Sequence, residues 1–247
     1  MTTTAWRSTT EIIRPRADLR RFDRIVAAIL MPIGPAAVAM LRFVIPGEPV
    51  AESVAADPSA QRLVLALGVV AVFTLLPGAY AAIHVLRRSA PRLTAWTAVL
   101  LIPGYLGMSA LFGLDAFTMA SYDAGMAPAD TKLVADAMMA LPTSTILMLA
   151  FLVGHIAGTV MLGTAALSAR AIPLFIGILL VISQPLHLVA VMTSLRWLDL
   201  VAWGLTAVGM AALAWRVLHT TNEEWDLPPT PQTESRSRSR RHVARPG

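Results

Sequence analysis

Residues 181–190, VISQPLHLVA, place polar side chains and a proline inside a long apolar run. Gln184 and His187 are three residues apart and Ser183 and His187 four apart, so a helix places all three on one face. A second histidine, His155, lies inside another apolar run, AFLVGHIAGTVMLG. Imidazole, hydroxyl and amide groups can carry a proton or bind a small polar molecule, and a pair of histidines can ligate haem iron.

Few other reactive groups accompany these residues. The chain has no cysteine, which excludes disulfides, thiolate catalysis and cysteine-ligated zinc or iron–sulfur centres. The apolar runs hold neither a carboxylate pair nor a nucleophile–base motif. The sequence therefore favours a protein that is not an enzyme, while leaving enzymatic activity open.

The composition indicates which elements must position these side chains. Of the 247 residues, 56% are hydrophobic and only 14% are charged, against about 25% charged in soluble proteins. Crossing a hydrocarbon core of roughly 30 Å takes about 20 apolar residues in a helix, because lipid offers the backbone no hydrogen-bond partners. We predict an all-α, polytopic transmembrane bundle with six spans, at residues 25–45, 63–86, 93–114, 144–168, 172–195 and 197–218.

The distribution of arginine predicts how the bundle is oriented. Most of the basic residues fall on the cytoplasmic side if the N-terminus is cytoplasmic, while acidic residues gather on the other side. Such a bias is typical of the positive-inside rule. The first 24 residues lack a signal-peptide pattern, so the first apolar run is expected to remain as an anchor. We predict a multi-pass protein of the bacterial plasma membrane, N-in and C-in.

Basic segments flank the apolar part of the chain. Residues 1–24 form a basic cytoplasmic segment, residues 25–218 the transmembrane domain, and residues 219–247 a basic cytoplasmic tail predicted to be disordered. Besides the lipid bilayer, the expected partners of these ends are anionic lipids. Nucleic acid is not expected, because a polybasic run is a weak pattern by itself.

Prolines occur near the middle of several predicted spans. Pro77–Gly78 and Pro103–Gly104 form similar PG pairs in the second and third spans, and Pro185 lies in the fifth. Proline removes a helical hydrogen bond, so we expect helix breaks at these positions. Paired interruptions mark binding sites in some transporters, although such residues often only kink a membrane helix.

The fourth span carries a ridge of small residues, Ala150, Gly154 and Gly158, which favours close contact with another helix. His155 lies beside this ridge and is expected to face protein rather than lipid. At 1.5 Å per residue, His155 and His187 would lie about 17 and 12 Å from the outer face. The two histidines could therefore be neighbours.

These expectations combine into a hypothesis of an outward-opening polar pocket. It would bind a small molecule, a lipid or a proton in a transport- or sensing-like role, since ionisable groups inside membranes usually face a cavity or a partner. The alternative is that the groups only join helices, in a structural or partner-binding subunit. The predicted ligand-binding residues are His155, Ser183, Gln184 and His187, with Asp115 and Asp199 at the rim.

The leading hypothesis includes no cofactor. A second alternative is a membrane cytochrome that binds a b-type haem through histidine ligands. His155 and His187 could ligate one iron near the outer side, and His84 and His219 lie near the inner ends of two spans. In b561-type cytochromes, which also have six spans, the ligand pairs lie on helices two apart in the sequence. The pairs in this chain do not match that pattern.

Residues 115–143 form the longest connection between spans. Within it, DTKLVADAMMAL (130–141) has apolar residues on one helical face and Asp130 in position to cap. We predict a short helix that lies on the outer surface or caps the bundle.

Two stretches near the C-terminal end, GHIAGTVMLGTAALSARAIP and SQPLHLVAVMTSLRWLDLVAWGLTAVGM, resemble small six-span membrane proteins of actinobacteria that have no established activity. The resemblance covers residues 144–210. It implies a six-span membrane fold and assigns a role to no residue.

Overall fold

The computed structural model describes residues 18–45 and 50–226. Within these residues, 88% are helical and no strand is present, which confirms the all-α prediction. Most of the predicted basic segments, 1–24 and 219–247, lies outside the described residues.

Six of the helices are long and apolar enough to cross a membrane, so the prediction of six spans is confirmed. Several extend beyond the predicted bounds, and in the second span a side-chain cap accounts for the earlier start. Asp57 accepts hydrogen bonds from the backbone N–H groups of Ser59 at 3.2 Å and Ala60 at 3.3 Å. The six are α1 (Arg20–Val44), α3 (Pro58–Leu86), α4 (Pro91–Asp123), α6 (Pro142–Ser168), α7 (Leu174–Thr193) and α8 (Arg196–His219).

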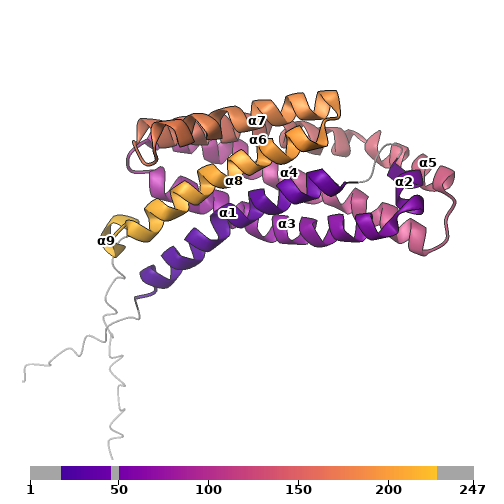
Figure 1. Cartoon of the computed structure of the whole chain (residues 1–247), viewed down its shortest axis with the longest axis horizontal. Coiled ribbons are helices and arrows are strands. Elements are labelled where there is room, and N and C mark those ends of the chain that lie inside the picture. The colour runs from indigo at the N-terminus through magenta and orange to yellow at the C-terminus, as the bar shows by residue number, and fades with distance from the viewer. Residues whose placement is uncertain (1–17, 46–49, 227–247) are drawn as a thin grey trace, which may run out of the picture.

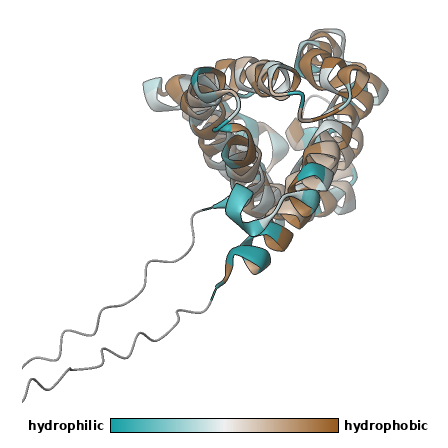
Figure 2. Ribbon diagram, turned by 90° about the vertical axis from the view of Figure 1, so that its left-hand side faces the viewer, coloured by the Kyte–Doolittle hydropathy of each residue, from teal (hydrophilic) through white to brown (hydrophobic). Residues whose placement is uncertain are grey.

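The long helices form a ring. Each packs against the next long helix in the sequence, and α8 closes the ring by packing extensively along α1 (Figure 1). Seen from one end, the helices surround a common centre (Figure 2). This closure brings the first and last spans together, which is the contact on which the polar site depends.

Two short helices, α2 (Val50–Ala56) and α5 (Pro128–Met139), lie at one end of the bundle, here named the α5 end (Figure 1). The predicted surface helix is thus present, although α2 was not predicted. Asp130 is not the N-cap of α5, because α5 begins at Pro128 and Asp130 lies in its first turn. The predicted apolar face points away from the bundle, with Leu133 70% exposed.

A short helix, α9 (Asn222–Trp225), lies at the opposite end, here named the α9 end, within the tail predicted to be disordered (219–247). That prediction is wrong for the part that the structure describes. Thr221 and Glu224 form a capping box, which orders this turn locally. The main-chain carbonyl at its end also accepts a hydrogen bond from His84 Nε2 at 2.9 Å.

The predicted helix breaks at Pro77, Gly78, Pro103, Gly104 and Pro185 are wrong. All of these residues lie inside continuous α-helices. A proline removes one hydrogen bond, but the flanking turns stay bonded and neighbouring helices hold the backbone in place. The glycine of each PG pair instead allows close approach, since a Cβ at Gly78 would lie 3.0 Å from the Leu30 carbonyl of α1.

The small-residue ridge predicted in α6 lies at a close contact between α4 and α6. A Cβ added at Gly154 would lie 2.5 Å from the Leu100 carbonyl oxygen, and one at Gly104 would lie 2.6 Å from the His155 nitrogen. A side chain at either glycine would therefore separate α4 from α6. The ridge confirms that His155 faces protein, with none of its surface exposed.

The exterior of the bundle is apolar. Large hydrophobic side chains are widely exposed around it, among them Phe73 (74%), Met192 (78%) and Trp215 (67%), and hydrophobic residues cover its flanks (Figure 2). A soluble monomer rarely exposes such an extended apolar surface. With the six spans, this surface indicates an integral membrane protein.

Candidate functional site

Buried polar residues gather where α6, α7 and α8 meet, and extend to the end of α1. His155, Ser183 and Gln184 have no exposed surface, and His187 and Asp199 are 6% and 3% exposed. Burying so many polar groups costs free energy unless they bond to one another. We refer to this group as the polar cluster, made of Arg42, His155, Ser183, Gln184, His187, Asp199, Trp203 and Thr206.

Asp199 is the centre of the ionic part of the cluster. One carboxylate oxygen lies 2.5 Å from His187 Nδ1, and the other lies 2.7 Å from Arg42 Nε. Asp199 is in the first turn of α8 and Arg42 in the last turn of α1, where the helix dipoles favour a negative and a positive charge respectively. Charge-assisted bonds of this length are the strong ones in proteins.

Two side chains, Asp199 and Trp203, lie within hydrogen-bond distance of the same ring nitrogen of His187. Nδ1 lies 2.5 Å from the Asp199 carboxylate and 3.2 Å from the indole nitrogen of Trp203. A protonated Nδ1 donates to Asp199, whereas an unprotonated Nδ1 accepts from Trp203 and requires the proton to sit on Asp199. The shorter distance favours the first arrangement. The same geometry nevertheless accommodates a proton on either partner.

His155 has a buried acceptor with no donor. Its Nδ1 lies 2.5 Å from the Phe151 carbonyl oxygen, which only accepts, so Nδ1 carries the proton and Nε2 carries a lone pair. Within the described part of the chain, Nε2 is buried and has no hydrogen-bond partner. An unsatisfied buried group of this kind costs about 1–3 kcal/mol. The ring centroid of His155 lies 5.4 Å from that of His187.

Ser183, Gln184 and Thr206 form a directional chain of hydrogen bonds. Gln184 Nε2 donates to Thr206 Oγ1 at 2.9 Å, Thr206 donates to Ser183 Oγ at 2.9 Å, and Ser183 donates to the Leu180 carbonyl at 2.8 Å. This direction fixes the amide of Gln184 and leaves its Oε1 buried without a donor among the described residues. The cluster therefore holds two orphan acceptors, the other being His155 Nε2.

The structure brings together five of the six predicted ligand-binding residues: His155, Ser183, Gln184, His187 and Asp199. The sixth, Asp115, lies apart, in a separate cavity at the α5 end. The predicted proximity of His155 and His187 is confirmed.

Three members of the cluster were not predicted. Trp203 and Thr206 follow Asp199 by four and seven residues, a spacing that places all three on one helical face and could have identified them. Arg42 carries no comparable signal, because its partner is 157 positions away in the sequence.

The packing around the histidines does not fit a haem. A porphyrin would have to lie between its two ligands, but Trp203 packs against both rings, with centroids 5.9 Å from His155 and 5.5 Å from His187. Phe151 stacks on His155 at 4.2 Å. At the other end, His84 and His219 bond to different main-chain carbonyls, those of Trp225 and Trp215.

Comparisons of the chain with protein-family models, with curated proteins and with solved structures found no match.

Proposed function

We propose that this chain is a multi-pass protein of the bacterial plasma membrane whose polar cluster binds a proton, in a sensing or transport role. The observation that carries the proposal is the orphan Nε2 of His155 beside the His187–Asp199 pair. A buried imidazole nitrogen with a free lone pair can take up a proton, which forms an N–H bond. Neighbouring groups that can share the proton make such a site suitable for reversible uptake.

Charge balance supports a proton as the ligand. With both histidines neutral, the Arg42 guanidinium and the Asp199 carboxylate cancel. A proton on the imidazoles lies beside the Asp199 carboxylate, which lowers the cost of holding its charge inside the membrane.

The proposed orientation is N-in and C-in, with the α5 end facing outward. Arginines gather at the α9 end, where Arg20, Arg87 and Arg88 bond to residues of the α9 segment. The α5 end carries more acidic groups, among them Asp123 and Asp136. This distribution agrees with the positive-inside rule, and the basic end would face anionic lipid. We also propose that the protein belongs with the actinobacterial six-span membrane proteins that its sequence resembles.

The proposal is tested by following the imidazole nitrogens of the protein in lipid bilayers by NMR. We expect the nitrogen signals of His155 and His187 to change together when the pH is lowered over the range in which the protein stays folded. The variants His155→Gln and His187→Gln assign the two signals, and Asp199→Asn should change the signal of His187.

The matched control is His219→Gln, at the exposed end of α8, which should leave both signals unchanged. If both imidazoles keep one protonation state over the whole range, the polar cluster only joins helices and the proposed function is wrong.

A further inference from the structure

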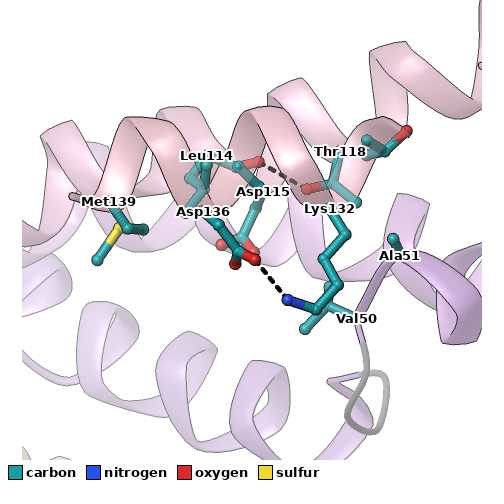
Figure 3. A pocket seen from close by; sticks show the side chains of 10 residues that line it. Val50, Ala51, Leu114, Asp115, Thr118, Lys132, Asp136 and Met139 are labelled. Atoms are coloured by element: carbon teal, nitrogen blue, oxygen red, sulfur yellow. Dashed lines mark hydrogen bonds and ion pairs between the residues drawn. The ribbon is translucent and has the colours of Figure 1, made fainter. Parts of the chain in front are cut away.

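A second polar site lies at the α5 end, outside the polar cluster. A cavity of about 220 Å³ opens between α2, α4 and α5. Its walls combine apolar side chains, such as Leu114 and Met139, with the carboxylates of Asp115 and Asp136 (Figure 3). A mixture of apolar wall and a few polar groups is typical of sites for small organic ligands.

The two carboxylates differ in their partners. Asp136 forms an ion pair with the Lys132 ammonium on α5, at 2.5 Å, and both side chains are more than half exposed (Figure 3). Asp115 is half-buried and forms no ion pair with any described residue. The nearby Arg42 guanidinium bonds to Asp199 instead. The Asp115 carboxylate is therefore the group in the cavity that could form an ion pair with a bound cation.

Gln61 supplies a second, independent observation beside Asp115. Its side chain is completely buried, and its Nε2 donates to the Asp115 carbonyl oxygen at 3.1 Å. Because that oxygen only accepts, the amide orientation is fixed, and Gln61 Oε1 is left without a donor among the described residues. Gln61 therefore bonds to Asp115 and carries a buried amide oxygen that lacks a donor within the described chain.

We propose that this cavity binds a small organic ammonium ion, with Asp115 as its counter-ion and Leu114 and Met139 packed on its alkyl group. An ammonium group carries the positive charge that pairs with the Asp115 carboxylate and the N–H groups that carboxylate and amide oxygens accept. The volume corresponds to roughly seven water molecules at about 30 Å³ each, enough for an amine of a few carbons. This site does not depend on proton binding by the polar cluster.

A metal ion fits the cavity less well than an ammonium ion. Calcium takes about six to eight oxygen ligands, and magnesium prefers an octahedral set. The described residues contain no cluster of three or more histidine, cysteine or carboxylate side chains placed to hold a metal. The apolar side chains of the wall provide no ligand for a metal ion, whereas an alkyl chain is stabilised by packing against them.

The experiment measures the thermal stability and binding heat of the full chain in lipid nanodiscs with propylammonium chloride. We expect saturable stabilisation, because a ligand that binds only the folded state raises its stability. Two controls should give no saturable effect. Sodium chloride supplies a positive charge without the propyl group, and 1-propanol supplies the propyl group without the charge. Asp115→Asn should weaken propylammonium binding by about tenfold or more.

Matched variants separate a lost site from a damaged fold. Ala135→Phe fills the cavity from α5 and should also abolish binding, whereas Ala137→Phe, on the exposed side of the same helix, should leave it intact. Asp123→Asn removes an exposed carboxylate at the end of α4 and should bind as wild type does. Equal binding by Asp115→Asn and wild type, or equal effects of propylammonium and sodium, would overturn the proposal.

Discussion

Arg42 and Asp199 join the first and last membrane spans through a bond of 2.7 Å between Nε and Oδ2. The Asp199 side chain is 4% exposed and that of Arg42 is 30% exposed, so the pair is largely removed from water. The same carboxylate bonds to His187 with its other oxygen. One residue of α8 therefore links the closure of the ring to the imidazoles in its interior.

Asp199→Asn is expected to destabilise the fold by about 2–4 kcal/mol, because it leaves the Arg42 guanidinium without its countercharge in a low-dielectric site. Denaturant unfolding in detergent measures the change. The control is Asp123→Asn, which removes an ion pair with Arg62 whose side chains are 56% and 58% exposed. Such an exposed pair contributes about 0–1 kcal/mol. Equal losses in the two variants would contradict a special role for Asp199.

Gly154→Ala is expected to lower stability by about 1–3 kcal/mol, because the added methyl group meets the Leu100 carbonyl at 2.5 Å and forces α4 and α6 apart. The thermal midpoint in nanodiscs measures this change. Gly113→Ala is the matched control on α4, since its Cβ would meet nothing within 4 Å. Alanine there should be neutral or stabilising by about 0.5–1 kcal/mol. A neutral Gly154→Ala would mean that the helices approach less closely than described.

The cap of α3 should lose its effect in acid. Hydrogen bonds from Ser59 and from the Ala60 backbone hold the pKa of Asp57 below its ordinary value of 3.8. Asp57 therefore contributes stability above that ordinary pKa, and the contribution disappears as the pH falls through the lowered pKa of the folded state. We expect Asp57→Ala to be less stable than wild type at neutral pH.

Below the lowered pKa of Asp57, the stabilities of wild type and Asp57→Ala should converge. Hydrogen exchange at the start of α3, measured at several pH values, follows this change. Asp57→Asn keeps a capping side chain without the titration, so its exchange should depend less on pH. A constant difference between wild type and Asp57→Ala at every pH would show that the carboxylate is not the capping group.

Proton binding and ammonium binding are expected to oppose each other, because both bring positive charge near Arg42. The charges that face this region are Arg42 on α1, Asp115 on α4, Lys132 and Asp136 on α5, and His187 and Asp199 on α7 and α8. Propylammonium should bind more weakly when the polar cluster holds a proton than when it does not, and thermodynamic linkage requires propylammonium to weaken proton binding by the same factor.

The paired variant His155→Gln, His187→Gln separates the two proposals. This variant should still bind propylammonium, but its affinity should depend much less on pH than that of the wild type. An unchanged pH dependence would mean that the antagonism arises at Asp115 alone, and that the two sites are not coupled.

The purified protein is expected to show no Soret band in its visible spectrum, because Trp203 packs against both His155 and His187. A Soret band that disappears in His155→Ala and His187→Ala, but not in His219→Ala, would instead establish a haem between the two histidines.

The sequence alone determined the six spans and the shared face of Ser183, Gln184 and His187. Both properties are local. The apolar length of a segment decides whether it can cross the bilayer, and the helical repeat decides which side chains lie together. The small-residue ridge beside His155 is local in the same sense, and it correctly indicated a protein-facing histidine.

Only the tertiary structure decided which groups meet across helices. Arg42 bonds to Asp199 because α8 closes the ring against α1, and Asp115 is separated from the polar cluster because α2 and α5 form a cavity with the end of α4. The prolines stay within continuous helices for a similar reason, since neighbouring spans hold the backbone. Hydropathy and helical period contain no information on the neighbours of a helix, because those depend on packing between segments far apart in the chain.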